Sequence, residues 1–563
     1  MDTELLQLQG GRNLERYEPN VCTNDSGEAC DDTATETLML AKLLERAVGW
    51  GLVIGAASLV YFTPVTTQRV FTLRSLQYRS DFVFLFVVIG AIALGIRSVM
   101  RHRRIESPRE DLTLYLALAL YLAASLAATG FSLHLRGLGF DLTGVANLTK
   151  TVLTVGLFVT VYSLTKDNDR LYRNVAMALF VSPLIPLAAG VLFVAGPLAR
   201  FATFRCTGNH ALFSWGERFQ GLTSDPLQFF VNACVALAFV WVLCLNSLER
   251  RRATASAASL IYAGALIYFA LWTQARGGVI AIAASLVVGA VATSSYWRQV
   301  RWRYVPSGAL AIALVLLAWL CLPPDVRQAV VARFHAGEAP VLATPATVPT
   351  GGVGPTSHAI ATRRPIDPCG TDAGRGLQST AGSTGRTTQD SLGAEEAQQS
   401  ADAPVHSTPA AKSGAASGQN TPILLAPGED ERLSIWRYYA GVALAHPLGI
   451  GFNYAREFYY STPHEPQVTV HNPFLLVWMY GGVFAEAGLL VLLWIVCRSA
   501  WTNIAGRRVR GSSLYYVGAV TALVGLFVFA ALGDLSFMDF TIWILMAMVV
   551  AKRAPATPGE KNP

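Results

Sequence analysis

Two arginines and one histidine occupy positions from which they could act on a substrate at a membrane. Arg218 lies in the loop 216–226, and Arg276 lies between two apolar runs that are joined by almost no loop. His471 comes two residues before another long apolar run. Guanidinium groups bind phosphate through paired hydrogen bonds, and a neutral imidazole can accept a proton. These residue types therefore favour chemistry on a phosphate-bearing substrate, with two cations and one base.

The neighbouring residues predict where two helices begin. Asn472 is followed by Pro473, and Asp225 is followed by Pro226. An Asn or Asp side chain caps free backbone amides, while a Pro in the first turn has no amide hydrogen to leave unpaired. The N-terminal end of a helix is positive, so it favours nearby anions and a neutral imidazole. We therefore expect His471 at the lip of a membrane helix.

Each of the three side chains also has a structural alternative. Arg218 can pair with the adjacent Glu217 or extend towards lipid headgroups. Arg276 is followed by two glycines, which would admit either a ligand or another backbone in a tight turn. His471 can cap or pack against its own helix. The combination favours the functional interpretation, because three residues far apart in the sequence would share one face of a bundle.

Two further ionisable residues are weaker candidates. Glu486 is the one acid deep in an expected membrane helix, where it would bond a neighbouring helix or gate a passage. At about 1.5 Å per residue it would lie about 20 Å from Pro473, unless the helix breaks at Gly481 and Gly482. Arg432 is expected to pair with an acid and so to fix the helix that contains it.

The composition indicates a membrane protein. The 563 residues are 52% hydrophobic and 14% charged, with a mean hydropathy of +0.39, which is too apolar for a soluble domain. The net charge of +7 does not indicate a nucleic-acid partner, because the basic residues form short clusters between apolar runs. Membrane lipids are therefore the expected surroundings.

Apolar runs of about 16 to 24 residues predict an all-α, polytopic membrane protein with about twelve transmembrane helices. The runs are at 47–64, 82–99, 111–131, 148–165, 174–197, 227–246, 256–275, 277–296, 304–322, 474–497, 513–533 and 536–552. The predicted regions are a cytoplasmic tail 1–46, helices one to nine in 47–322, a loop 323–473, the last three helices in 474–552 and a cytoplasmic tail 553–563.

The long loop divides into two parts. Residues 336–430 contain no Phe, Trp or Tyr, so this part cannot bury enough apolar surface to offset its ordering entropy and is predicted to be disordered. From residue 431 apolar side chains follow helical spacing, which predicts an amphipathic helix over the ends of the bundle. The segment 431–473 thus combines this helix with the residues before His471.

Basic connections predict the orientation. The stretches 97–109, 166–173, 250–252, 298–303 and 498–510 are rich in Lys or Arg and alternate along the chain, so all should be cytoplasmic. The loop 65–81 carries three arginines on the opposite side and is an exception. Both termini are then cytoplasmic, while Arg218, Arg276 and His471 all fall on the external face.

Several motifs, taken in order, resemble the O-antigen ligase and polymerase superfamily. They are Arg-Phe-x-Gly-x-x-x-Asp-Pro at 218–226, Ala-Arg-Gly-Gly at 275–278, Arg-Leu-Ser-Ile-Trp at 432–436 with His-Pro-Leu-Gly-Ile-Gly-Phe at 446–452, and His-Asn-Pro at 471–473. The resemblance covers about residues 200–500, and the first four helices only by topology. Leu227 departs from the family pattern, where Asn is more frequent.

This resemblance implies a multi-pass glycosyltransferase of the GT-C type in the bacterial inner membrane, active on the periplasmic face in lipopolysaccharide biosynthesis without a metal or other cofactor. The donor would be a glycan on undecaprenyl diphosphate, and in a ligase the acceptor would be a sugar hydroxyl of lipid A-core. Arg218 and Arg276 match the arginines thought to bind the diphosphate. His471 matches the histidine proposed as the base.

Four alternatives remain open. A ligase, an O-antigen polymerase and a protein O-oligosaccharyltransferase share the donor, and they differ in the acceptor, which lies outside the motifs. A transporter is the alternative from another class, and it would show internal repeats and broken helices with polar residues near mid-membrane. The sequence shows no repeat, and its ionisable groups other than Glu486 gather at helix ends.

Overall fold

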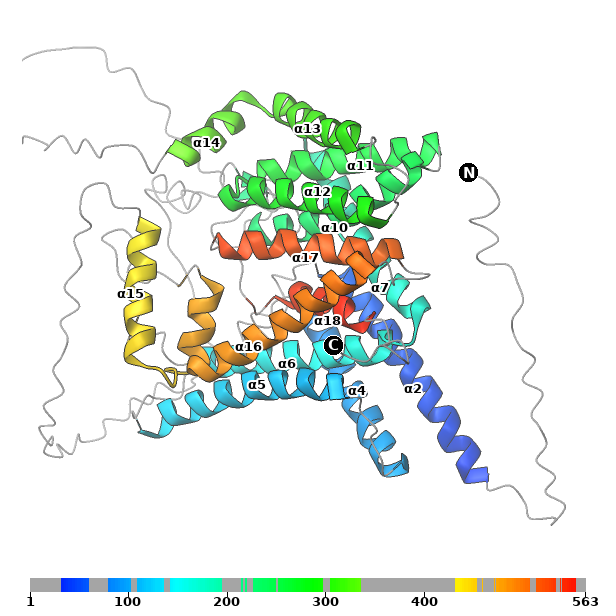
Figure 1. Ribbon diagram of the computed structural model, residues 1–563, viewed down its shortest axis with the longest axis vertical. Helices are drawn as coiled ribbons and strands as arrows, with labels where there is room; N and C mark the ends of the chain where they lie inside the picture. Colours follow the sequence, from blue (N-terminus) through cyan, green and yellow to red (C-terminus); the bar gives the residue numbers. More distant parts are fainter. Residues whose placement is uncertain are drawn as a thin grey trace, which may run out of the picture.

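The structure is a computed structural model that describes residues 32–59, 79–102, 109–135, 142–194, 214–215, 218–219, 226–249, 252–296, 304–335, 431–452, 458, 470, 472–506, 513–532, 537 and 539–552. These residues are almost entirely helical, which confirms the expected all-α class (Figure 1). Within the described ranges seven helical stretches are long and apolar enough to cross a membrane, and four shorter apolar helices accompany them. The segment 336–430 lies outside the described residues.

The helices before the long loop begin with α2 (Asp32–Ala57), α4 (Arg79–His102), α5 (Arg109–Leu135), α6 (Leu142–Thr165), α7 (Asp169–Val181) and α8 (Leu184–Val194). Two short strands follow, β1 (Ser214–Trp215) and β2 (Arg218–Phe219), and then α10 (Pro226–Glu249), α11 (Ala253–Trp272), α12 (Arg276–Tyr296), α13 (Tyr304–Cys321) and α14 (Pro324–His335). The remaining helices are α15 (Glu431–Ala445), α16 (Pro473–Gly506), α17 (Ser513–Ala531) and α18 (Phe540–Ala551).

Three helices differ from the sequence-based expectation. α2 begins at Asp32, inside the expected polar tail 1–46, because the residues after it are mostly good helix formers. The run at 174–197 is interrupted between α7 and α8 at Pro183, which has no amide hydrogen to continue the helix. α14 forms within the expected loop 323–473 and begins at Pro324, a favoured first helical residue.

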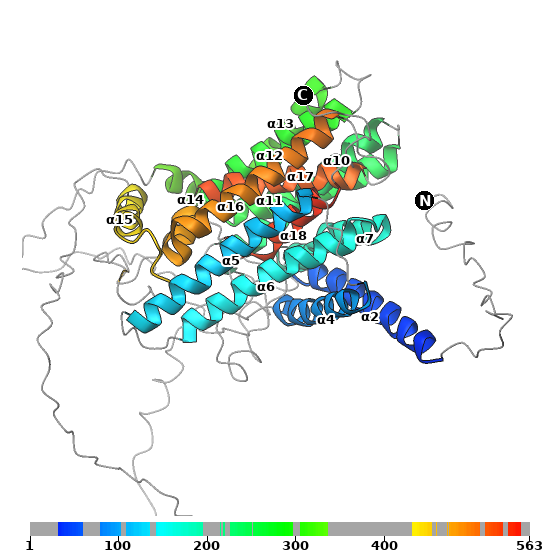
Figure 2. The same cartoon turned by 60° about the horizontal axis from the view of Figure 1, so that its bottom comes forward.

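The last three helices lie between two groups of helices (Figure 1). α17 packs against α10 and α12 on one side, while α16 packs against α5 and α18 packs against α6 on the other. Every residue of α18 is buried, so this short apolar helix forms part of the interior. Figure 2 shows α5 and α6 side by side beneath this layer.

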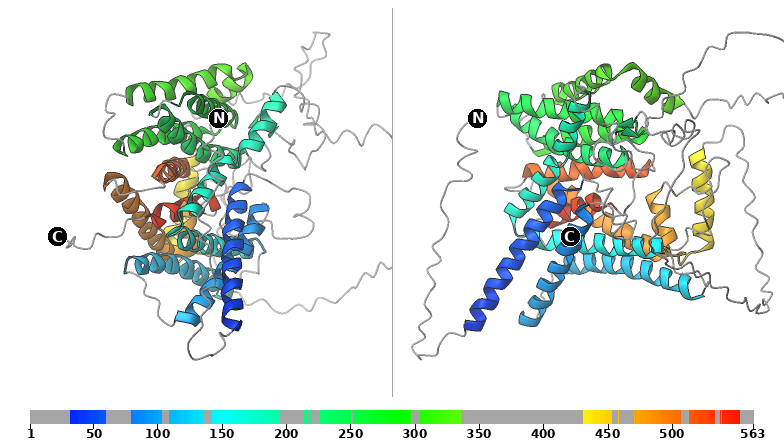
Figure 3. Two further views of the ribbon diagram at one scale, coloured as in Figure 1. Left: turned by 90° about the vertical axis from the view of Figure 1, so that its right-hand side faces the viewer. Right: turned by 180° about the vertical axis from the view of Figure 1, so that it is seen from behind.

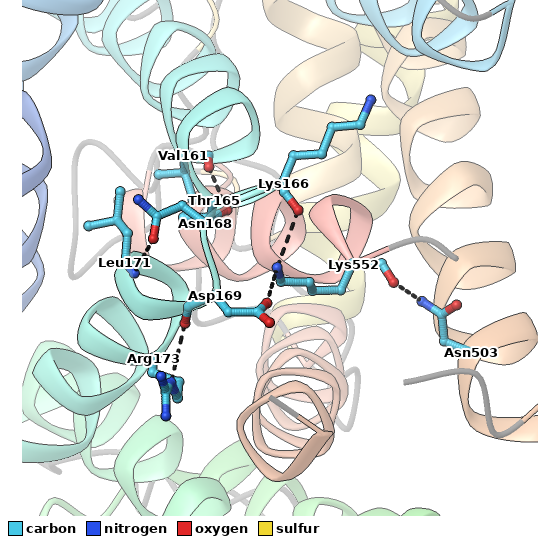
Figure 4. A network of polar contacts seen from close by, with 9 residues as sticks. All are labelled: Val161, Thr165, Lys166, Asn168, Asp169, Leu171, Arg173, Asn503 and Lys552. Carbon is cyan, nitrogen blue, oxygen red and sulfur yellow. Dashed lines mark hydrogen bonds and ion pairs between the residues drawn. The ribbon is translucent and has the colours of Figure 1, made fainter. Parts of the chain in front are cut away.

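Polar contacts join several connections at one end of the bundle (Figure 4). Lys552, just after α18, bonds the carboxylate of Asp169 and the carbonyl of Lys166, and its own carbonyl accepts a hydrogen bond from Asn503. Lys166 also pairs with Asp111 at 2.8 Å. The basic connections near residues 109, 166–173 and 503 therefore share one end, as the alternation along the chain predicts. The side of a membrane that this end faces stays a prediction.

Candidate functional site

The structure describes the backbone at both of the arginines that are expected to bind phosphate. Arg218 lies in β2, where it pairs with Trp215 of β1, and Arg276 is the first residue of α12. The side chains of these two arginines and of Arg432 in α15 lie outside the described part of the chain. His471 and Asp225 lie outside the described residues altogether. The site is therefore built from the elements that carry these residues.

Phe219 anchors the strand that carries Arg218. Its side chain is 1% exposed, and its ring lies against Phe229 of α10, Phe269 and Trp272 of α11, with centroid distances of 4.9, 4.6 and 6.1 Å. Aromatic pairs at these distances stabilise a packing beyond the area they bury. Since Trp272 is the last residue of α11, β2 and the start of α12 lie at the same end of the bundle.

The turn before Arg276 is short and buried. Thr273 donates a hydrogen bond from its hydroxyl to the Ala270 carbonyl at 2.6 Å, and Gln274 has a φ of 55°. Gln274 is the one non-glycine residue in the described ranges with a positive φ, a conformation that costs energy for an L-residue. The expectation of almost no loop between these two helices is confirmed.

The two glycines after Arg276 serve close helix packing. A Cβ on Gly278 would lie 2.5 Å from the ring of Phe230 in α10, and one on Gly277 would lie 3.0 Å from the Cβ of Leu532 beyond α17. Only glycine leaves room at these distances. The structure thus supports the packing alternative for this pair, and it brings the start of α12 against α10 and α17.

Aromatic side chains near the end of α17 connect this region with the start of α16. Phe230 meets Phe529 at 4.6 Å, Phe527 meets Phe537 at 6.3 Å, and Phe537 meets Phe474 at 5.4 Å between ring centroids. The side chain of Asn472 accepts hydrogen bonds from the amides of Phe474 and Leu475 at 3.0 and 3.2 Å, so the expected helix cap is confirmed. The elements carrying Arg218 and Arg276 therefore gather at the end where α16 starts, directly after His471.

α16 is broken at Gly482, which has φ 68° and ψ −168°. The break frees backbone groups, and the chain after α15 bonds them: the Val483 amide donates to the Pro447 carbonyl at 2.8 Å, and the Ile450 amide donates to the Met479 carbonyl at 2.7 Å. Gly449 also has a positive φ and approaches Gly482 closely. From the sequence, a break at Gly481 and Gly482 was the condition under which Glu486 would lie closer to Pro473. The structure shows that the helix does break, at Gly482.

The same segment is held on its other side by α5. The Phe452 amide donates to the Thr129 hydroxyl at 3.3 Å, and the Ser132 hydroxyl donates to the Ile450 carbonyl. A Cβ on Gly451 would lie 2.7 Å from the Cα of Thr129, so the two backbones are in direct contact. Residues 446–452 are thus locked between α5 and the broken α16. No local sequence pattern distinguishes Thr129 or Ser132, which lie in an apolar run.

α15 stands beside the first half of α16 (Figure 3). Its buried side chains Ile435, Tyr439 and Ala443 follow helical spacing, which agrees with the apolar face that the sequence predicts. Burial raises the pKa of the adjacent Tyr438 hydroxyl above its usual value, so this group is a neutral donor near pH 7. α15 and the locked segment 446–452 therefore form one packed unit with α16.

Two indole groups near this unit have hydrogen-bond donors that no described residue accepts. The Nε1 atoms of Trp436 in α15 and Trp478 in α16 are buried without a partner in the described part of the chain. Both rings pack against the cluster that contains Tyr439 and Met479. A buried donor without a partner is costly, and a sugar hydroxyl or an ordered water would satisfy it. Tryptophans within an apolar helix face gave no signal of this in the sequence.

Glu486 lies four residues beyond the break. Its side chain is 8% exposed, and its Oε2 atom is buried with no hydrogen-bond partner in the ranges that the structure describes. The expected hydrogen bond to a neighbouring helix is therefore not made by this oxygen. A gating role for Glu486 stays a prediction.

The fold defines the class of this chain as a helical, multi-pass membrane protein with an interrupted helix at its candidate site. No protein-family model and no curated protein matches the chain. We therefore infer the activity from the ordered motifs and from the geometry of the elements that carry them.

Proposed function

We propose that the protein is a glycosyltransferase of the O-antigen ligase type. It transfers a glycan from undecaprenyl diphosphate to a sugar hydroxyl of lipid A-core, at the periplasmic face of a bacterial inner membrane, and it has a GT-C-like plan of about twelve spans. One observation carries the proposal: β2 with Arg218, the start of α12 at Arg276, and the start of α16 just after His471 gather at one end of the bundle.

The proposed reaction is a single in-line displacement with inversion. The acceptor oxygen attacks the anomeric carbon, the bond from that carbon to the diphosphate oxygen breaks, and the diphosphate leaves with the electron pair. His471 takes the proton of the acceptor hydroxyl. Arg218 and Arg276 neutralise the diphosphate, so that two guanidinium groups do the work for which other transferases use a metal.

The acceptor distinguishes this activity from two related ones, since an O-antigen polymerase or a protein O-oligosaccharyltransferase would use the same donor. A lipopolysaccharide gel of a deletion strain separates these activities. Loss of all long chains with accumulation of lipid-linked polymer supports a ligase. A single capped repeat unit supports a polymerase, and unchanged lipopolysaccharide supports a protein acceptor.

Transport is the second candidate, and the break in α16 favours it. Interrupted helices with a buried acid nearby are typical of transporter binding sites, and Glu486 is such an acid. The break is filled by the backbone of residues 446–452, which form two hydrogen bonds across it. This filling supports a structural role for the break and a transferase rather than a transporter.

The decisive experiment is a transfer assay with the purified full chain in detergent, supplied with lipid-linked donor and lipid A-core acceptor. Transfer without a membrane potential or a second compartment supports the transferase and contradicts transport. The assay is run with and without a chelator, and equal rates are expected because the proposed reaction uses no metal. Loss of activity on chelation would contradict the proposed use of two arginines.

Replacing Arg276 by Lys is expected to lower kcat/KM for transfer by about 10–100-fold, because Lys keeps the charge but loses the paired hydrogen bonds to phosphate. The measurement is initial rate against donor concentration. Arg173→Lys is the matched control, since Arg173 lies in α7 near the opposite end of the bundle and bonds the Asp169 carbonyl at 3.4 Å. Equal activity of both variants would remove Arg276 from the site.

A further inference from the structure

Gln274 has a backbone conformation that only glycines share with it in the described ranges. Its φ of 55° is positive, and the other positive φ angles there belong to Gly449, Gly451 and Gly482. Glycine adopts such a conformation without steric cost, whereas the Cβ of any other residue comes too close to the following carbonyl oxygen. A glutamine at position 274 therefore carries a backbone cost that a glycine would avoid.

The backbone around Gln274 forms a common type of helix ending. α11 ends at Trp272, Thr273 caps it with a φ of −65° and a ψ of −15°, and the Gln274 amide donates to the Leu271 carbonyl at 3.0 Å. Helices often end with one residue in the left-handed conformation directly after the cap, and that residue is usually glycine and sometimes asparagine. The glutamine therefore stands where the backbone geometry favours a smaller residue.

The side chain of Gln274 is buried as well. Gln274 is 5% exposed, and its neighbours Thr273 and Ala275 are 0% and 8% exposed. A glutamine amide has two donor hydrogens and one acceptor oxygen, and such groups are normally hydrogen-bonded when they leave water. The side chain is therefore a fixed part of the turn. A glycine at this position would adopt the backbone conformation more easily, but it could not supply these buried contacts.

The turn 273–275 connects the two elements that carry the arginines proposed to bind phosphate. Before the turn, Trp272 at the end of α11 holds the ring of Phe219 at 6.1 Å between centroids, and Phe219 follows Arg218 in β2. After the turn, α12 begins at once with Arg276. The conformation of three residues therefore sets how the start of α12 lies relative to the strand of Arg218.

We propose that Gln274 is a positioning residue that fixes the placement of Arg276 relative to Arg218. This role rests on the proposed function, since the diphosphate of the donor is the group that both arginines would bind. Two cations already spaced for a diphosphate lose less freedom on binding than two cations joined by a turn that can move. The left-handed backbone and the buried amide of Gln274 hold the turn in one conformation, and a glycine there relaxes this restriction.

Gln274→Gly separates this role from a contribution to stability. Relief of the strained backbone offsets the greater freedom of glycine in the unfolded chain, so the midpoint of thermal denaturation should stay within about 3 °C of the wild type or rise. The affinity of the purified full chain for undecaprenyl diphosphate, titrated in a maltoside detergent, should fall by about 10-fold, because the two arginines are no longer held at a fixed spacing. Transfer at low donor concentration should fall by about 10–100-fold.

Gln328→Gly is the matched control, because Gln328 is exposed in α14 and glycine destabilises a helix. It should lower the midpoint and leave the affinity for undecaprenyl diphosphate unchanged, which is the opposite of the pattern expected at position 274. Gln274→Asn is measured as well, so that a folding defect of the glycine variant does not decide the result. Asparagine tolerates the left-handed conformation, but its amide is one methylene shorter, so this variant should fold and lose at least about threefold in affinity.

The outcomes separate the positioning role from the proposed function. If the wild type transfers glycan and both variants at position 274 match it in affinity and rate, the positioning role is overturned and the transferase stands. If affinity falls only together with the midpoint, Gln274 merely stabilises the fold, and the positioning role is overturned as well. A folded wild type that does not bind undecaprenyl diphosphate contradicts the proposed function itself and removes the basis of the positioning role.

Discussion

Replacing His471 by Ala is expected to lower the rate of glycan transfer by about 10²–10⁴-fold, the usual contribution of a general base. The acceptor hydroxyl must lose its proton as it attacks, and Ala has no group that can take it. The amount of folded protein should not change, because the cap of α16 is made by Asn472 rather than by the histidine. The measurement is the single-turnover rate at saturating donor.

His134→Ala is the control for this substitution. His134 lies in the last turn of α5 and is exposed, so its loss should leave transfer unchanged. A fully active His471→Ala variant would remove the base assignment while leaving the phosphate-binding arginines untouched. Loss of donor binding in that variant, rather than loss of rate, would make His471 a ligand of the donor and not a base.

Replacing Gly482 by Ala is expected to destabilise the protein by about 2–6 kcal/mol, the sum of a strained backbone conformation and a steric collision. Gly482 has a φ of 68°, and a Cβ there would lie 2.4 Å from the carbonyl carbon of Leu448 and from the Pro447 oxygen. Backbone atoms cannot turn aside as a flexible side chain can. The segment 446–452 should leave the break, and transfer should fall with it.

The measurement is the temperature at which half of the purified protein leaves the monodisperse peak in gel filtration. Gly441→Ala in α15 is the matched control, because a Cβ there meets nothing within 4 Å and Ala is the better helix former. It should leave the temperature unchanged or raise it. A Gly482→Ala variant as stable as this control would show that the contact between the segment 446–452 and α16 is not needed for the fold.

The hydrogen bonds around Gly482 also fix the first half of α16, which begins at Pro473, two residues after His471. These two backbone hydrogen bonds connect the segment after α15 to both halves of α16, and Thr129 and Ser132 fasten that segment to α5. The first half of α16 begins directly after His471. We therefore expect a change at the break to displace the start of α16 relative to α10 and α12, and so to alter the proposed site without touching substrate.

Local features of the sequence determined much of the secondary structure. The apolar runs identify most of the helices, the Asn472 cap predicts the start of α16, and the change of character at residue 431 marks the start of α15. These features depend on hydrogen bonds and side-chain spacing between residues three or four apart, so a short stretch of sequence is enough to predict them. Composition does not mark the start of α2 or the interruption at Pro183, because polar helix formers precede the apolar part of α2 and the run 174–197 is apolar on both sides of the proline.

The tertiary structure alone decided which of these pieces meet. Ser132 bonds the Ile450 carbonyl across 318 positions of sequence, and Phe452 bonds Thr129 across 323. No local pattern specifies such contacts, since they depend on the shapes and small residues of several helices at once. The sequence by itself determined a helical membrane protein with candidate phosphate-binding and base residues, and the packing decided that the elements carrying them share one end.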